Sequence, residues 1–70
     1  MLVKSQDGSS MTNVQSAVDV RCRYRLDGND VICGSMVMGS FDTPERADQI
    51  VSEIRTLLLN YKYGYQVPAK

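Results

Sequence analysis

Three arginines at alternate positions, Arg21, Arg23 and Arg25, are the residues of this chain whose type and spacing best suit a binding site. Alternate residues of a β-strand share a face, so the guanidinium groups would project together at intervals of about 6.6 Å. That interval is close to the phosphate spacing of an extended nucleic-acid strand, so the row could bind a polyanion. Asp19 and Asp27 flank the row and lower its potential. They favour the other interpretation, in which the charges keep an edge strand from pairing with another chain.

A second candidate group consists of Ile32, Met36 and Met38. In the strand pairing preferred below, these residues share the arginine face and lie away from the helix, where a monomer would expose them. Methionine suits adaptable interfaces, and arginine stems can pack beside it. The group therefore predicts contact with a partner or a second copy of the chain. If the strand pairs one residue out of register, the same residues form the core instead.

Catalytic residue types are scarce. The chain has no histidine, which excludes the Ser-His-Asp and Cys-His nucleophile pairs and removes the commonest general base and zinc ligand. Gly34 and Gly39 have the spacing of a phosphate-binding P-loop, but Ser40 and Phe41 stand where Lys and Ser or Thr are required. We therefore expect no catalytic residue, no cofactor and no metal, and we expect that the protein is not an enzyme.

The arginines belong to a stretch in which apolar and charged residues alternate. The apolar positions are Val18, Val20, Cys22, Tyr24 and Leu26. This period of two predicts a half-buried strand. Residues 27–30 interrupt the pattern, and a second strand-like stretch covers residues 31–41, so the two stretches predict a hairpin.

The pairing register of this hairpin has three alternatives: a loop at residues 28–29, at 27–28, or at 27–29. Both two-residue loops turn the same residues of the second strand toward the core, namely Val31, Cys33, Val37 and Phe41. The loop at 27–28 also sets Cys22 opposite Cys33, whereas the three-residue loop turns Ile32, Met36 and Met38 inward. We prefer the two-residue loops because they place Phe41 beneath the helix that follows.

A helix start is marked by Asp42 or Thr43 as the cap and by Pro44 in the first turn. Apolar residues then recur at helical spacing at Ala47, Ile50, Val51, Ile54, Leu57, Leu58 and Tyr61. The spacing predicts an amphipathic helix that runs to about Lys62, with Gly64 as its terminator. Tyr63 and Tyr65 beyond it either bind a ligand or cover the open end of the core, and covering is the commoner use of tyrosine there.

These elements predict an α+β fold, a small two-layer ββα unit in which the antiparallel hairpin packs on one C-terminal amphipathic helix. We expect residues 1–13 to be a flexible leader, residues 14–63 the single domain and residues 64–70 a C-terminal tail. The alternative is a short extra edge strand from either terminus, for example at Leu2 and Val3.

Composition narrows the class of protein. With 43% hydrophobic and 23% charged residues, the chain has the composition of a folded globular domain, and 70 residues are too few for two domains. No apolar run approaches the length of a membrane span. The two cysteines, Cys22 and Cys33, are too few for a disulfide framework, so we expect free thiols and a cytoplasmic location.

We therefore expect a small non-catalytic protein–protein interaction domain that acts as an adaptor, regulator or stoichiometric inhibitor. Because so short a chain supplies a core worth only about 3–5 kcal/mol, we expect a homodimer that also binds another protein. One alternative is a nucleic-acid-binding module that uses the arginine row, and another is a binder of small anionic ligands. The zero net charge and the lack of stacking aromatic residues beside the arginines weigh against nucleic acid.

Overall fold

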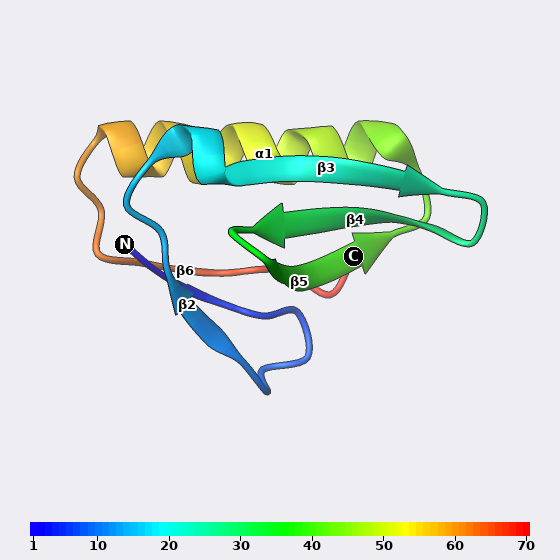
Figure 1. Ribbon diagram of the computed structural model, residues 1–70, viewed down its shortest axis with the longest axis horizontal. Helices are drawn as coiled ribbons and strands as arrows, with labels where there is room; N and C mark the ends of the chain where they lie inside the picture. Colours follow the sequence, from blue (N-terminus) through cyan, green and yellow to red (C-terminus); the bar gives the residue numbers. More distant parts are fainter.

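The computed structural model describes residues 1–70, which fold into six strands, one α-helix and one short 3₁₀-helix (Figure 1). In chain order the elements are β1 (Leu2–Lys4), β2 (Met11–Asn13), η1 (Ala17–Asp19), β3 (Val20–Arg25), β4 (Gly28–Cys33), β5 (Met36–Phe41), α1 (Pro44–Leu59) and β6 (Gly64–Gln66). Strands β3, β4 and β5 form an antiparallel sheet in that order, and α1 packs on one of its faces. The predicted α+β fold, a hairpin packed on one C-terminal helix, is confirmed.

The helix begins and ends at identifiable residues. The Oγ1 atom of Thr43 accepts a hydrogen bond from the backbone N–H of Arg46, and Pro44 occupies the first turn. The buried stripe of α1 consists of Ala47, Ile50, Val51 and Ile54. The helix ends at Leu59, three residues before the predicted end at Lys62, and Tyr61 adopts a left-handed backbone with φ of 57°. Tyr61 therefore leaves the apolar stripe to which its spacing assigned it.

The hairpin register differs from the alternatives that the sequence suggested. Arg25 lies opposite Gly28, so the loop consists of residues 26–27, and Cys22 faces Val31 rather than Cys33. A loop at 28–29 would have set Asp30 opposite Asp27, whereas the observed register sets Asp30 opposite Arg23 and avoids that repulsion. The loop still has two residues, so Val31 and Cys33 face the core as predicted.

A bulge between β4 and β5 reverses two of the predicted orientations. Val31 lies opposite Gly39, but the next residue, Ile32, lies opposite Val37, so Met38 is the extra residue. An extra residue shifts the alternation of inward and outward side chains. Consequently Met38, predicted to face outward, is 1% exposed in the core, and Val37, predicted to face inward, is 47% exposed.

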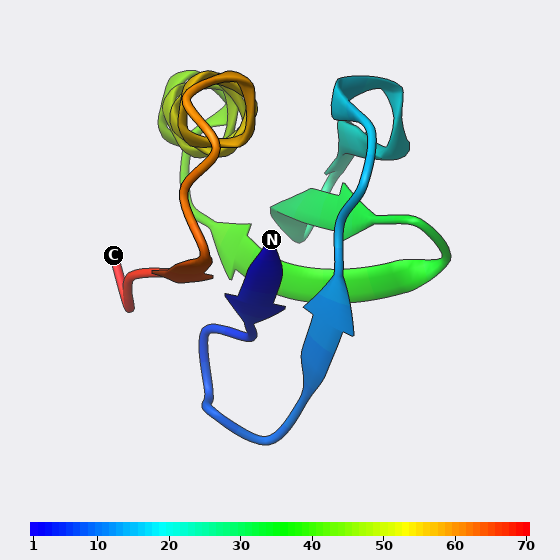
Figure 2. The same ribbon diagram turned by 90° about the vertical axis from the view of Figure 1, so that its left-hand side faces the viewer.

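A second sheet closes the core from below. Its order is β2-β1-β6, with β1 antiparallel to β2 and parallel to β6, so the residues expected to form a leader and a tail contribute strands instead (Figure 2). Val3 and Val67 are buried from this side, as is Val14 just after β2. Short strands from both termini, which the sequence offered as an alternative, are thus present as β1 and β6. The sequence did not predict β2 or the pairing of the three strands, because each has three residues and no sustained period.

Gln6 joins the second sheet to β5. Its backbone N–H donates to the carbonyl of Met38 at 2.7 Å, and its side-chain Oε1 accepts from the N–H of Ser40 at 3.0 Å. Its Nε2 donates to the carbonyl of Pro68 at 3.0 Å. A Cβ atom on Gly39 would lie 2.9 Å from a methyl group of the buried Val67 and 3.2 Å from the Cβ of Gln6. The terminal segments can approach β5 this closely only because residue 39 has no side chain.

We predict that Gly39→Ala lowers the free energy of unfolding by about 1–3 kcal/mol, because the added methyl overpacks this contact. Gly64→Ala is the matched control: its Cβ would meet only the Leu2 carbonyl, at an ordinary 3.5 Å. Losing a glycine there should leave stability unchanged or raise it by up to about 1 kcal/mol. Urea denaturation of both variants measures the difference. Equal stabilities would contradict the close approach at Gly39.

Candidate functional site

The three arginines lie where the sequence placed them, on one face of β3 and opposite the face that α1 covers. Arg23 and Arg25 both bind Asp30 of the neighbouring strand β4. The Nη2 of Arg23 lies 2.7 Å from Oδ2 of Asp30, and the Nε of Arg25 lies 2.9 Å from the same oxygen. Asp30 is fully buried beneath these two side chains, so two of the three cations already share an internal carboxylate.

The electrostatics of this cluster hold Asp30 in its charged form. Hydrogen bonds from Arg25, and to a smaller extent from Arg23 and the Ser40 hydroxyl, lower the pKa of Asp30 to about 2 and outweigh the opposing effect of burial. The same hydrogen bond, together with Asp27 at 3.0 Å, raises the pKa of Arg25. The cluster is therefore a permanent ion triad at neutral pH.

Arg21 is the arginine of the row without a carboxylate partner. Its Nη1 donates to the backbone carbonyl of Gly34 at 2.7 Å, at the turn between β4 and β5. The side chains of Arg23 and Arg25 remain 53% and 41% exposed. The outer face of the sheet thus carries three accessible guanidinium groups and one buried carboxylate.

The three apolar residues expected beside the arginines do not form a surface group. Ile32 shares the arginine face but is buried, with Arg21 opposite it on one side and Val37 on the other. Met36 is partly exposed at the start of β5, and Met38 lies in the core. The structure therefore brings Arg21, Arg23, Arg25 and Ile32 onto one face and separates Met36 and Met38 from them.

A thiol and a phenol converge on Asp48 at the side of the sheet that α1 covers. Oδ1 of Asp48 accepts hydrogen bonds from the Cys22 thiol, at 3.3 Å, and from the Tyr24 hydroxyl. Burial and the nearby carboxylate raise the pKa of Cys22 to about 11, and the hydrogen bond to Asp48 raises the pKa of Tyr24 to about 12. The Cys22 thiol is thus protonated at neutral pH and poorly nucleophilic. The cluster links β3 to α1.

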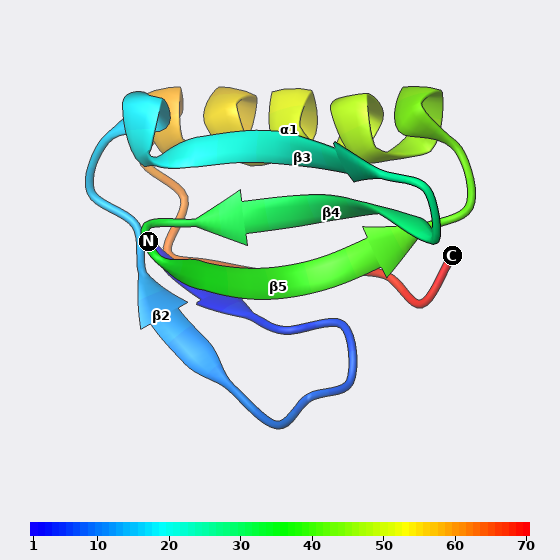
Figure 3. The same ribbon diagram turned by 45° about the vertical axis from the view of Figure 1, so that its right-hand side comes forward.

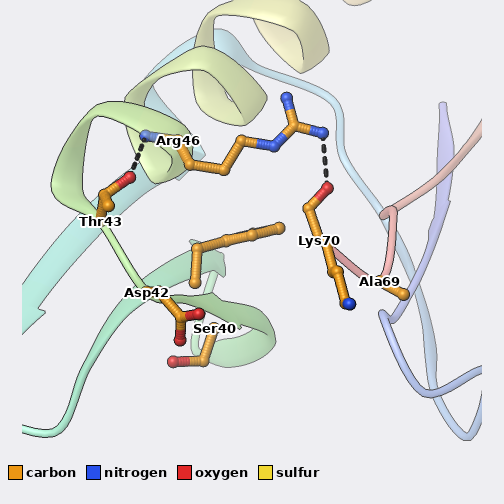
Figure 4. Close-up of a pocket in the computed structure, with 7 residues that line it drawn as sticks. Ser40, Asp42, Thr43, Arg46, Ala69 and Lys70 are labelled. Atoms are coloured by element: carbon orange, nitrogen blue, oxygen red, sulfur yellow. Dashed lines mark hydrogen bonds between the residues drawn. The ribbon is translucent and has the colours of Figure 1, made fainter.

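Two shallow hollows flank the contact between β5 and the terminal segments. One, of about 180 Å³, lies at the start of α1, where Arg46 donates to the Lys70 carbonyl at 2.7 Å (Figure 4). The other, of about 250 Å³, lies between residues 5–10 and residues 37–40. Every buried side-chain nitrogen and oxygen has a hydrogen-bond partner, so neither hollow presents an unpaired buried polar group.

Segments that carry exposed apolar residues meet at the end of the molecule where α1 stops, which Figure 2 views head-on. We define this end face by Leu2, Val18, Leu59, Tyr61 and Tyr63, which are 50% to 93% exposed. The N–H of Leu2 donates to the carbonyl of Tyr63 at 2.9 Å, and η1, which holds Val18, packs on α1. Sequence reasoning missed this surface because it assigned Val18 and Tyr61 to the buried faces of a strand and a helix.

Searches against protein-family models, curated proteins and solved structures returned no match. No group of three or more metal-ligating side chains that could hold an ion is present, and no helix has the length and apolarity that crossing a membrane requires.

We predict that the Asp30 carboxylate stays ionised down to about pH 2, and that its contribution to the free energy of unfolding changes with pH only in the acid range. Its folded pKa of about 2 lies below the ordinary value of 3.8, so the stabilisation is complete above about pH 4 and is lost as the pH falls toward 2. A carboxyl-carbon NMR titration measures the midpoint directly, and a midpoint near 4 would contradict the ion triad.

Two variants compare how much the buried carboxylate of Asp30 and the exposed carboxylate of Asp7 each contribute to stability in acid. Hydrogen bonds from Ser9 and Ser5 also lower the pKa of Asp7 to about 2, but Asp7 is exposed to solvent, where such interactions are screened. Asp30→Asn should therefore reduce the loss of stability between pH 4 and pH 2 more than Asp7→Asn does. Acid denaturation followed by circular dichroism makes the comparison.

Proposed function

We propose that this protein is a small non-catalytic protein–protein interaction domain that forms a homodimer through the end face and acts as an adaptor, regulator or stoichiometric inhibitor. The observation that carries the proposal is that five exposed apolar residues belong to segments that meet at one end of the molecule. Single exposed apolar residues are ordinary, but a group of them on one surface is typical of interaction sites.

The backbone of Tyr61 adds independent support. A tyrosine in the left-handed region costs roughly 1–2 kcal/mol relative to glycine, and Tyr61 gains no burial in return because it is 89% exposed. Helices commonly end with glycine at such positions. An aromatic side chain held at that cost on the surface supports a role in binding, where tyrosine is a frequent contributor of binding energy.

A second copy is the occupant that this surface suits best. The five side chains that define the end face carry no charge, so two copies related by a two-fold axis would meet without like-charge repulsion where Lys62 and the N-terminal amino group of each copy lie outside the contact. Tyr61 and Tyr63 are almost fully exposed, and burying both side chains would remove roughly 300–500 Å² of surface from water. That area is a large part of the approximately 800 Å² that each partner buries in a stable complex. Dimerisation would also supplement the small core of a 70-residue chain.

The alternatives have less support. Arg23 and Arg25 are already bound to Asp30, which reduces the attraction of the row for phosphates. The hollow at the start of α1 is lined by Arg46, but that side chain already binds the Lys70 carbonyl and lies 5.8 Å from the centre of the Phe41 ring. The proposal includes a cytoplasmic location, which the two free thiols favour.

We predict that Tyr61→Gly weakens the dimer while stabilising the monomer. Glycine relieves the left-handed backbone, so the free energy of unfolding measured at high dilution should rise by about 1 kcal/mol. Loss of the aromatic ring should raise the dimer dissociation constant at least about tenfold. Sedimentation equilibrium across tens of micromolar measures dimerisation.

Leu26→Ser is the matched control, since Leu26 is an exposed apolar residue in the β3–β4 turn, at the opposite end of the molecule (Figure 1). It should leave the dissociation constant unchanged. A wild-type protein that sediments as a 7.8 kDa monomer throughout this range would overturn the proposed homodimer. Equal effects of Tyr61→Gly and Leu26→Ser on the dimer dissociation constant would also overturn it.

For nucleic acid, we predict that wild-type protein binds single strands no tighter than the non-specific range, roughly 10⁻⁴ to 10⁻⁶ M at physiological salt. The reason is that the buried carboxylate of Asp30 already neutralises part of the arginine row. Fluorescence anisotropy with a labelled oligonucleotide tests this. Sub-micromolar, salt-sensitive binding that is lost when Arg21, Arg23 and Arg25 are replaced by alanine would favour a nucleic-acid-binding module instead.

A further inference from the structure

Strand β3 lies at an open edge of its sheet. The sheet order places β4 on one side of β3 and no strand on the other; in Figure 3, β3 is the uppermost strand of the sheet, with α1 drawn above it. An edge strand offers unpaired N–H and C=O groups to a further strand. The opposite edge of this sheet differs, because Gln6 already bonds to Met38 and Ser40 of β5.

The direction of the backbone groups follows from one hydrogen bond. The N–H of Gly34 donates to the carbonyl of Asp19 at 2.8 Å, so Asp19 points toward β4, and by alternation Arg21, Arg23 and Arg25 do so as well. Val20, Cys22 and Tyr24 therefore point their backbone groups toward the open edge.

The hydrogen bonds of Val20 agree with this direction, and they make its own backbone groups unavailable to a further strand. Its carbonyl accepts a hydrogen bond from Nη2 of Arg55 on α1 at 2.6 Å, and its N–H donates to the carbonyl of Ala17. None of the backbone bonds outside the ladders involves Cys22 or Tyr24. The free stretch of edge thus consists of the two N–H and two C=O groups of these residues.

The charges beside this edge disfavour a second copy. In a two-fold antiparallel pairing of two β3 strands, the arginine rows would share a face. A pairing centred on Arg23 sets arginine opposite arginine three times. One centred on Cys22 or Tyr24 does so twice, and there Asp19 or Asp27 would offset the repulsion by facing the remaining arginine. Like charges directly opposite each other destabilise strand pairing. Acidic side chains in the same positions would instead meet Arg21, which has no carboxylate partner, and the exposed parts of Arg23 and Arg25.

We propose that the open edge of β3 binds an extended segment of a partner protein that carries acidic side chains at alternate positions. The acidic residues lie beside Arg21, Arg23 and Arg25, and the residues between them lie on the other face, next to α1 and the Tyr24 ring, which is 58% exposed. Backbone pairing supplies affinity, and the alternating charges supply specificity. This inference rests on the proposed role in protein–protein interaction and names the chemistry of the partner.

The probe is an eight-residue peptide in which glutamate and valine alternate, titrated into the full-length protein and followed by ¹⁵N–¹H NMR. The expected shifts are largest at Cys22 and Tyr24, whose N–H groups become bonded. A peptide with lysine in place of glutamate is the charge control, and it should bind at least tenfold more weakly. Rising salt should weaken binding of the glutamate peptide and narrow its advantage over the lysine peptide, because salt screens attraction and repulsion alike.

Methylation of the peptide nitrogens tests backbone pairing without changing the protein. In an antiparallel pair, the residues that point toward β3 have side chains on the Tyr24 face, so N-methylation of the valines should weaken binding at least tenfold and methylation of the glutamates should not. In a parallel pair these two outcomes exchange. Either result supports strand addition. Equal effects of the two methylation patterns would overturn it.

A pair of protein variants provides a second test. Cys22→Pro removes an N–H that faces the open edge and no ladder bond, which edge strands tolerate. Cys22→Ala removes the same thiol and keeps the N–H. The proline variant should lose peptide binding at least tenfold relative to the alanine variant. If the proline variant fails to fold, the methylated peptides decide the question alone.

The outcomes separate this inference from the proposed homodimer. Absence of peptide binding by a wild-type protein that dimerises would overturn strand addition alone, as would an oligonucleotide that shifts the same resonances and binds more tightly than the peptide. Peptide binding that persists in monomeric Tyr61→Gly protein would show that the edge and the end face act independently.

Discussion

The close approach of the terminal segments to Gly39 is the contact on which the rest of this structure depends. One helix can cover one face of a three-stranded sheet, and it leaves the core open beside β5. Val3 and Val67 close that opening, and Gln6 supplies the hydrogen bonds that join the two sheets. The missing side chain at residue 39 sets how closely they can pack, so the termini belong to the core rather than to its surroundings.

This closure makes the two edges of the main sheet unequal. Backbone groups at the β5 edge are bonded to Gln6, whereas β3 keeps Cys22 and Tyr24 unpaired at its edge. The Tyr24 side chain, on the face that α1 covers, is held by Asp48, and Arg55 of α1 binds the Val20 carbonyl where this edge begins. An edge held in place on one side and open on the other is preorganised for a partner strand, since little of its backbone has to become ordered on binding.

The sequence predicted those parts of the fold that repeat with a period. The alternation around the arginines predicted β3, and the spacing of Ala47, Ile50 and Ile54 predicted the buried stripe of α1. It could not predict the bulge at Met38, because one extra residue changes which side chains face inward without any local signal. A strand at Leu2 and Val3 was an alternative, but its place in a second sheet could not be predicted, since Val3 is the single buried residue of β1 and a single residue has no period.

The arginine row shows why residue spacing alone does not define a binding site. Spacing placed Arg21, Arg23 and Arg25 correctly, but their chemistry depends on Asp30, which the hairpin register brings opposite Arg23. A loop at residues 27–28 would instead have set Asp30 opposite Arg25. In the observed register the row keeps enough positive charge to repel a second β3 strand and too little aromatic surface to stack nucleobases. The arginines that would keep this edge from pairing with a second copy would also select an acidic strand. The same three residues would therefore serve both purposes.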